Sequence, residues 1–174
     1  MEPQKKLSVA ENIALLVASG AKLSQKTGAF MMPVSRGYRE AVERNRLHKA
    51  YLNTTYRVYE PAIDIRIDKE NHGLAATLLQ IGHTEWAYLT AWNPCSKQLT
   101  PEENEKRNQR LLEDLKQFVV FNGEGVGDDP SWPPEKSYLV AGIHREVGIY
   151  LGKKYEQNAI VVGQGVKAEL VMLK

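Results

Sequence analysis

The sequence predicts a single α/β domain in which helices cover a mixed β-sheet, preceded by a helical extension. The chain has 174 residues with 43% hydrophobic residues, enough to bury one sizeable core. Along the chain, segments in which polar and apolar residues alternate are interspersed with segments in which apolar residues recur at helical spacing. Two helix starts carry capping patterns, at Ser8 and at Thr100. We place the extension at residues 1–34 and the α/β domain at residues 35–174.

Two helices are expected in the N-terminal third. Ser8 and Glu11 form a capping-box pattern, which predicts a short helix from residue 9 to about 19 that Gly20 ends. Residues 22–37 are weakly patterned. A second helix is expected from Ser35 to about Leu52, because apolar residues recur there at helical spacing. These residues are Tyr38, Val42, Leu47 and Tyr51.

The middle of the chain predicts the start of the sheet. Residues 54–59 and 62–67 alternate polar and apolar residues, as half-buried strands do. A helical stripe follows at residues 74–81 and ends at Gly82. Residues 86–92 are apolar and uncharged, so we expect this strand to lie centrally in the sheet.

The last third has the clearest helix start. Thr100 is the N-cap, Pro101 takes the first helical position and two glutamates fill the first turn, which predicts a helix to about residue 117. A short strand at 119–121 and a long loop from Gly123 to Pro134 should follow. The remaining expected elements are a strand at 138–143, a helix at 144–155, and strands at 158–162 and 168–173.

Composition narrows the classes of partner. Lysine and arginine number 23 against 21 acidic residues, and this near balance makes nucleic acid an unlikely partner. Cys95 is the single cysteine, so no intramolecular disulfide forms, which fits a reducing compartment. No apolar run approaches the roughly 18 residues of a membrane helix. We therefore expect a soluble, cytoplasmic protein with no membrane partner.

Four short motifs in the second half of the chain resemble those of a known family. The motifs are T-A-W-N-P at 90–94, N-x-x-x-N at 104–108, W-P-x-E-x-S in the loop region and Q-N-A at 157–159. This pattern resembles DUF3293, a family of bacterial proteins of unknown function. The resemblance implies a family for residues 35–174 and no activity.

The T-A-W-N-P motif lies where a central strand is expected to end. Asn93 precedes a proline, which biases it away from helix, and its side chain can form an Asx-turn as a purely structural role. Alternatively it contacts a ligand, because open α/β sheets bind ligands beyond such strand ends. Ser96 and the free N–H groups of the helix that starts at Pro101 would add donors suited to an anion.

Other amides are expected near the same place. Asn104 and Asn108 share the helix face that packs on the sheet, and they either bond to the neighbouring loop or point into the pocket of Asn93. Gln157 and Asn158 begin a buried strand, where they either satisfy backbone groups or bind a ligand.

The tryptophan loop supplies the only candidate catalytic acid. Glu135 is the expected general base or polar anchor. Trp132 either anchors the loop in apolar contacts or stacks on a ligand. The glycines of 123–127 lack the following helix and lysine of phosphate-binding loops, so they should form a mobile or tight turn. The histidines show no metal-ligand spacing, so no metal site is expected.

These residues suggest one ligand site and leave its chemistry open. We expect a small-molecule-binding protein or an enzyme that acts on a polar or phosphorylated metabolite. The amides are many and the nucleophiles few, which favours binding or proton transfer over covalent catalysis. The alternative is a protein-interaction module that uses the Trp132 loop and the N-terminal extension. The sequence names no cofactor and no oligomeric state. A single site requires that Asn93, Asn104, Glu135 and Asn158 converge.

Overall fold

The computed structural model describes residues 8–24, 30–31, 33 and 35–174. The chain divides into two compact units, Met1–Asn45 and Arg46–Lys174, which we treat separately. The division falls inside a helix, α2 (Arg36–Asn53). The boundary expected between residues 34 and 35 stays a prediction.

The first unit contains a helix and a small hairpin. Helix α1 (Val9–Ala18) starts at the predicted capping box, in which Ser8 and Glu11 bond each other's backbone N–H. Gly20 follows the helix with a left-handed φ of 84°, as the stop signal predicted. Strands β1 (Lys22–Leu23) and β2 (Phe30–Met31) pair antiparallel, and α1 has no buried residue.

The second unit contains the sheet and the helices that cover it. Its first elements are β3 (Thr55–Val58), β4 (Ile63–Ile65), α3 (His72–Gln80), β5 (Glu85–Leu89) and a 3-10 turn η1 (Pro94–Ser96). These are followed by α4 (Pro101–Asp114), β6 (Val119–Val126), β7 (Glu135–Ala141), α5 (Arg145–Lys154), β8 (Ala159–Gln164) and β9 (Lys167–Met172). The predicted α/β class is confirmed.

The seven strands form one sheet in the order β4-β3-β6-β7-β5-β8-β9. Each neighbouring pair is antiparallel, which corrects the mixed strand directions expected from the sequence. The helical crossovers do join strands of equal direction, β5 to β6 through α4 and β7 to β8 through α5. In each case, however, another strand lies between the two, which is the split β-α-β (βαββαβ) arrangement. The predicted central position of β5 is confirmed.

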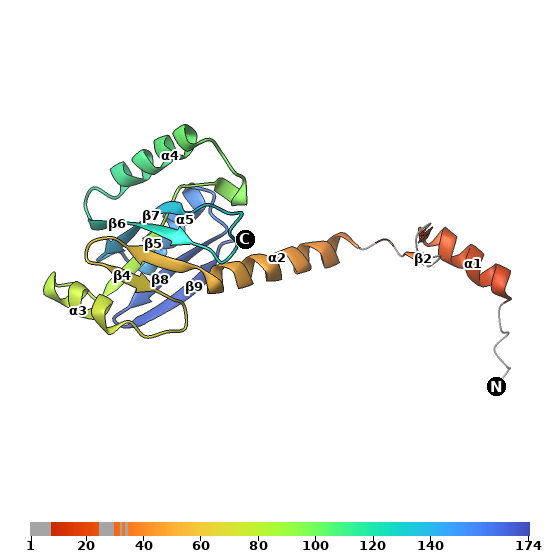
Figure 1. The fold of residues 1–174 in the computed structure, drawn as a ribbon, viewed down its shortest axis with the longest axis horizontal. Helices are drawn as coiled ribbons and strands as arrows, with labels where there is room; N and C mark the ends of the chain where they lie inside the picture. The colour runs from red at the N-terminus through yellow and green to blue at the C-terminus, as the bar shows by residue number, and fades with distance from the viewer. Residues whose placement is uncertain (1–7, 25–29, 32, 34) are drawn as a thin grey trace. The chain divides into compact units, whose positions relative to one another are not determined.

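Each face of the sheet has its own apolar core. Figure 1 labels α3, α4 and α5, the helices that supply side chains to these cores. Side chains alternate along β5, so Ala87 and Leu89 face α4 and α5, whereas Trp86 and Tyr88 face α3. Leu111 of α4 joins the first core. The second core receives Leu74 and Leu78 of α3 and, from the end of α2, Leu52.

Part of the loop expected from its glycines is instead strand β6. The predicted strand at 119–121 extends to Val126, so Gly123 and Gly125 lie in the sheet. Glycine is needed at 123 because a Cβ would collide with the carbonyl oxygen of Arg57 and the hydroxyl of Tyr88. That hydroxyl donates to the carbonyl oxygen of Arg57, so the glycine admits a cross-strand hydrogen bond.

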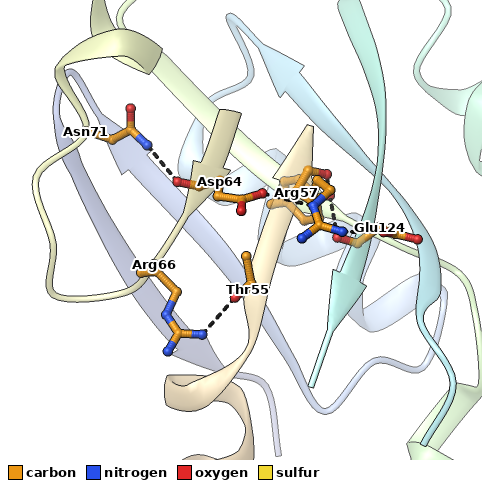
Figure 2. A network of polar contacts seen from close by, with 7 residues as sticks. Thr55, Arg57, Asp64, Arg66, Asn71 and Glu124 are labelled. Carbon is orange, nitrogen blue, oxygen red and sulfur yellow. Dashed lines mark hydrogen bonds and ion pairs between the residues drawn. The ribbon is translucent and has the colours of Figure 1, made fainter. Parts of the chain in front are cut away.

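Polar side chains connect three strands at one edge of the sheet (Figure 2). Arg57 of β3 bonds Asp64 of β4 and Glu124 of β6, each at 3.0 Å. Arg66 donates to Thr55 at 2.8 Å, and Asn71 donates to the carbonyl oxygen of Asp64 at 3.0 Å. These contacts help to fix the register of β4, β3 and β6.

Candidate functional site

The antiparallel register brings three strand ends together. Leu89 near the end of β5 pairs with Tyr138 of β7, and Tyr88 pairs with Val161 of β8. The residues that follow β5 therefore lie beside the residues that begin β7 and β8. From the sequence, the site was expected beyond the end of a central strand. In this antiparallel sheet, the end of β5 meets the starts of two other strands.

The segment after β5 is a turn with unusual backbone geometry. Asn93, Cys95 and Ser96 have positive φ values of 44°, 54° and 55°. Non-glycine residues rarely take this conformation, and it persists only where the surroundings hold it. One holding contact is the Cys95 N–H, which donates to the carbonyl oxygen of Glu156 at 2.8 Å, and Glu156 itself has a φ of 59°. We call residues 93–96 the strained turn.

Asn93 and Asn104 lock the start of the strained turn. The backbone N–H of Asn93 donates to Oδ1 of Asn104 at 2.8 Å, and Nδ2 of Asn104 donates back to Oδ1 of Asn93 at 2.9 Å. Oδ1 of Asn93 also accepts from the N–H of Leu99 at 3.0 Å. Both asparagines are buried. The Asx-turn expected at Asn93 is not formed; its side chain instead accepts from a backbone N–H six residues on, at Leu99.

Asn108 makes a second brace one turn further along α4. Its Oδ1 accepts from the N–H of Ala91 at 2.8 Å, and its Nδ2 donates to the carbonyl oxygen of Lys136 at 2.9 Å. The side chain is fully buried. Because β5 has stopped pairing at this point, the asparagine supplies the partner that a neighbouring strand would otherwise provide.

Glu135 brings a carboxylate to the same place. Its Oε1 accepts from Nδ2 of Asn93 at 2.7 Å and from the indole Nε1 of Trp132 at 3.0 Å. Burial raises the pKa of Glu135, while these two hydrogen bonds act in the lowering direction and do not cancel the rise. The residue begins β7, whereas the sequence analysis had placed it in the loop.

The opposite side of the strained turn carries hydroxyl and amide groups. Nδ2 of Asn158 donates to Oγ of Ser96 at 2.7 Å. The phenol of Tyr51 interacts with both side chains and with the charge of Glu135; burial raises its pKa, while Ser96 and Asn158 lower it. Lys174 lies beside the turn and donates to Sγ of Cys95 at 2.7 Å.

Two further side chains hold backbone carbonyls around the turn. Nε2 of Gln157 donates to the carbonyl oxygens of Trp92 and Tyr155, at 3.0 and 3.2 Å. Arg107 of α4 donates to the carbonyl oxygens of Ala91 and Tyr155, at 2.9 and 2.8 Å. Together these contacts connect α4 and the end of α5 to the end of β5.

The structure brings the predicted residues into one neighbourhood. Asn93, Asn104 and Glu135 form one hydrogen-bonded chain, and Asn158 contacts Ser96 within the strained turn. Tyr51 and Lys174 were missed. No local motif marked them, because one lies on a helix whose apolar spacing already explains a tyrosine and the other follows the last strand.

The start of α4 does not offer the anion site that the sequence suggested. The side chain of Thr100 accepts the N–H of Glu103, and the glutamate returns the bond, so the capping box occupies these groups. Glu102 and Glu103 also place negative charge at this end of the helix. An anionic ligand is therefore disfavoured there.

A cleft of about 420 Å³ lies between α4 and α5, and it is lined by Arg107, Arg110, Glu113, Asp114, Lys154 and Tyr155. Arg107 also takes part in the contacts around the strained turn. No group of three or more potential metal ligands occurs among the residues that the structure describes. Within the same residues, no helix is both long and apolar enough to cross a membrane.

Comparison with known proteins finds a family match for part of the chain. Residues 89–160 match DUF3293. This family is described as a protein of unknown function. The resemblance read from the sequence is confirmed for this segment, and the DUF3293 match spans every site residue that the sequence analysis proposed. Tyr51 and Lys174 lie outside it. No curated protein and no solved structure matches the chain.

Proposed function

We propose that the protein binds a small polar molecule at the end of the sheet, beside the strained turn. In this proposal Glu135, Ser96, Asn158 and Tyr51 face the ligand. Asn93, Asn104 and Asn108 hold the turn, and Gln157 and Trp132 support it. The observation that carries the proposal is the run of left-handed residues next to a partly buried carboxylate.

The positive φ angles of the strained turn are energetically costly, which favours a functional role for this segment. Each non-glycine residue in the left-handed region costs on the order of 1 kcal/mol or more, and such residues cluster at ligand sites. Here three of the four residues of the turn are strained, and buried amides hold them in place. A loop that only connected β5 to α4 could use glycine, as the turns at Gly82 and Gly142 do.

The chemistry offered by the site is acceptor-rich. Oε1 of Glu135 accepts hydrogen bonds from two N–H donors, whereas Oε2 accepts none from the described residues. A hydroxyl or amine of a ligand can donate to this oxygen. The raised pKa also suits Glu135 to take and return a proton, so proton transfer is the reaction class that fits if the protein is an enzyme. The capped start of α4 favours a polar ligand over a phosphorylated one.

A ligand screen tests the proposal directly. The intact protein is melted in the presence of single polar metabolites, since a ligand at 100 times its Kd stabilises the native state by about 2.7 kcal/mol. Hits are repeated with Glu135→Gln and Asn158→Ala, and with Glu113→Gln as the control on an exposed face of α4. We expect the two site variants to lose the ligand shift and the control to keep it. A hit that survives both site variants would place binding elsewhere.

The alternative function is a protein-interaction module that uses the Trp132 loop and the N-terminal extension. One observation favours it: the amides of Asn93, Asn104 and Asn108 are already bonded to the protein. A screen without any hit, together with co-purification of a protein that Trp132→Ala releases, would favour this alternative.

A further inference from the structure

The near-neutral charge of the chain is unevenly divided between the two units. Residues 1–45 contain seven lysines and arginines against four acidic residues, a formal charge of +3. Residues 46–174 contain sixteen against seventeen, a formal charge of −1. A basic segment attached to a nearly neutral body favours an anionic partner for the segment rather than for the body.

The same segment carries an apolar helix without a core. Helix α1 leaves Val9, Ile13, Leu15 and Val17 exposed, at 77%, 43%, 57% and 57%, and none of its residues is buried. Val9, Ile13 and Val17 recur at four-residue spacing and so share one side of the helix. The capping box lies entirely within α1 and its N-cap, so the helix start needs no packing partner.

Basic residues accompany this helix on both sides. Lys5 and Lys6 precede it in the sequence and Lys22 follows it, while Glu11 is its one acidic residue. Helix α2 adds three exposed arginines before residue 46, at 36, 39 and 44, of which Arg36 is paired with Glu40. An apolar helix can lie in a lipid interface, and basic residues near it in the chain add attraction to anionic headgroups.

We propose that the described part of the first unit, helix α1 and the start of α2, binds an anionic lipid surface, with α1 lying in the interface and the exposed cations on the headgroups. The ten residues of α1 span about 15 Å, half of the hydrocarbon thickness, so the helix lies along the surface and does not cross it. Nucleic acid fits less well, because it would leave the four apolar side chains in water. This proposal revises the expectation that the protein has no membrane partner, and it does not depend on the ligand site.

Vesicle flotation of the intact protein tests the proposal. The probes are vesicles of phosphatidylcholine alone and of phosphatidylcholine with phosphatidylglycerol. We expect binding only to the anionic vesicles, weaker at high salt. Ile13→Asn with Val17→Asn should weaken partitioning at least tenfold through lost apolar burial. Arg39→Gln should weaken it about fivefold, since each cation near the surface contributes about that factor.

Matched variants in the second unit are the controls. Leu79→Asn replaces an equally exposed apolar residue of α3, and Arg110→Gln replaces an exposed cation of α4. Both should float like the wild type. Because Ile13 and Val17 are exposed, their variants should melt like the wild type, which separates lost binding from lost folding.

Three results would overturn the proposal. The first is equal flotation of wild type and the α1 variants, or of anionic and neutral vesicles. The second is retention by a polyanion column, abolished by Arg39→Gln and not by the α1 variants, which would indicate nucleic acid. The third is a concentration-dependent dimer in light scattering that Ile13→Asn dissociates in the absence of lipid, which would assign the apolar side of α1 to a second copy of the chain.

Discussion

Replacing Asn108 by alanine tests whether the buried amides act as braces. The substitution removes the acceptor of the Ala91 N–H and the donor to the carbonyl oxygen of Lys136. The two groups differ in what they lose. The carbonyl oxygen keeps the hydroxyl of Thr90 at 2.7 Å, whereas the contacts of the described residues give the Ala91 N–H no second acceptor.

The free-energy change follows from that difference. An orphaned buried donor costs about 1–3 kcal/mol, and the cavity left by the amide adds to it. We therefore expect Asn108→Ala to lower the free energy of unfolding by about 3 kcal/mol. For a chain of this length each kcal/mol shifts Tm by about 2–4 °C, so Tm should fall by roughly 9 °C.

The assay is thermal and urea unfolding followed by circular dichroism. Gln109→Ala is the matched control, because the neighbouring amide is exposed and makes no hydrogen bond among the described contacts; its change should stay within about 0.5 kcal/mol. If Asn108→Ala loses no more stability than this control, the bracing argument is refuted. Asn108 would then be available to a ligand, as the sequence analysis had allowed.

Three further predictions concern the site and the sheet. Burial raises the pKa of Glu135, so the folded state holds the proton more tightly and the protein loses stability as pH rises above the usual glutamate range. In urea titrations, the stability of Glu135→Gln relative to the wild type should therefore be higher at pH 7 than at pH 4. An equal difference at the two pH values would contradict this. Gly123→Ala should prevent folding or cost several kcal/mol because its Cβ meets Arg57 and Tyr88, whereas Gly37→Ala, in open space, should not. Limited proteolysis should cut the segment 127–134 in the free protein and less in the presence of a bound ligand; unchanged cleavage would show that Trp132 pins it permanently.

Local signals in the sequence predicted the elements well. Capping boxes at Ser8 and Thr100 depend on residues three apart, so the chain alone specifies them. The shared face of Asn104 and Asn108 follows from helical spacing, and both are buried against the end of β5. Hydrogen bonds to the neighbouring loop were one of the two roles expected of these amides, because a buried amide needs partners.

Structural features that depend on contacts between distant residues could not be predicted from the sequence. Gly123 resembles a loop glycine, because its need for a missing Cβ arises from Tyr88, a residue 35 positions earlier in the chain. Whether neighbouring strands are parallel depends on which strand lies between the two strands that each helix connects, and no local sequence pattern predicts that arrangement. Tyr51 joins the site only because α2 ends beside β3, so its role becomes visible only in three dimensions.

The position of β5 in the sheet has a consequence for the order in which the protein can fold. The residues of β7 and β8 that pair with β5 lie 49 to 79 positions later in the chain, so almost the whole chain must be synthesised before this strand is paired on both sides. The segment that matches DUF3293 starts at the last residue of β5 and stops at the second residue of β8. Its limits therefore cut two adjacent central strands. A fragment of residues 89–160 would hold all four sequence motifs of this chain and lack the sheet needed to fold them, so the strained turn can be studied only in the longer chain.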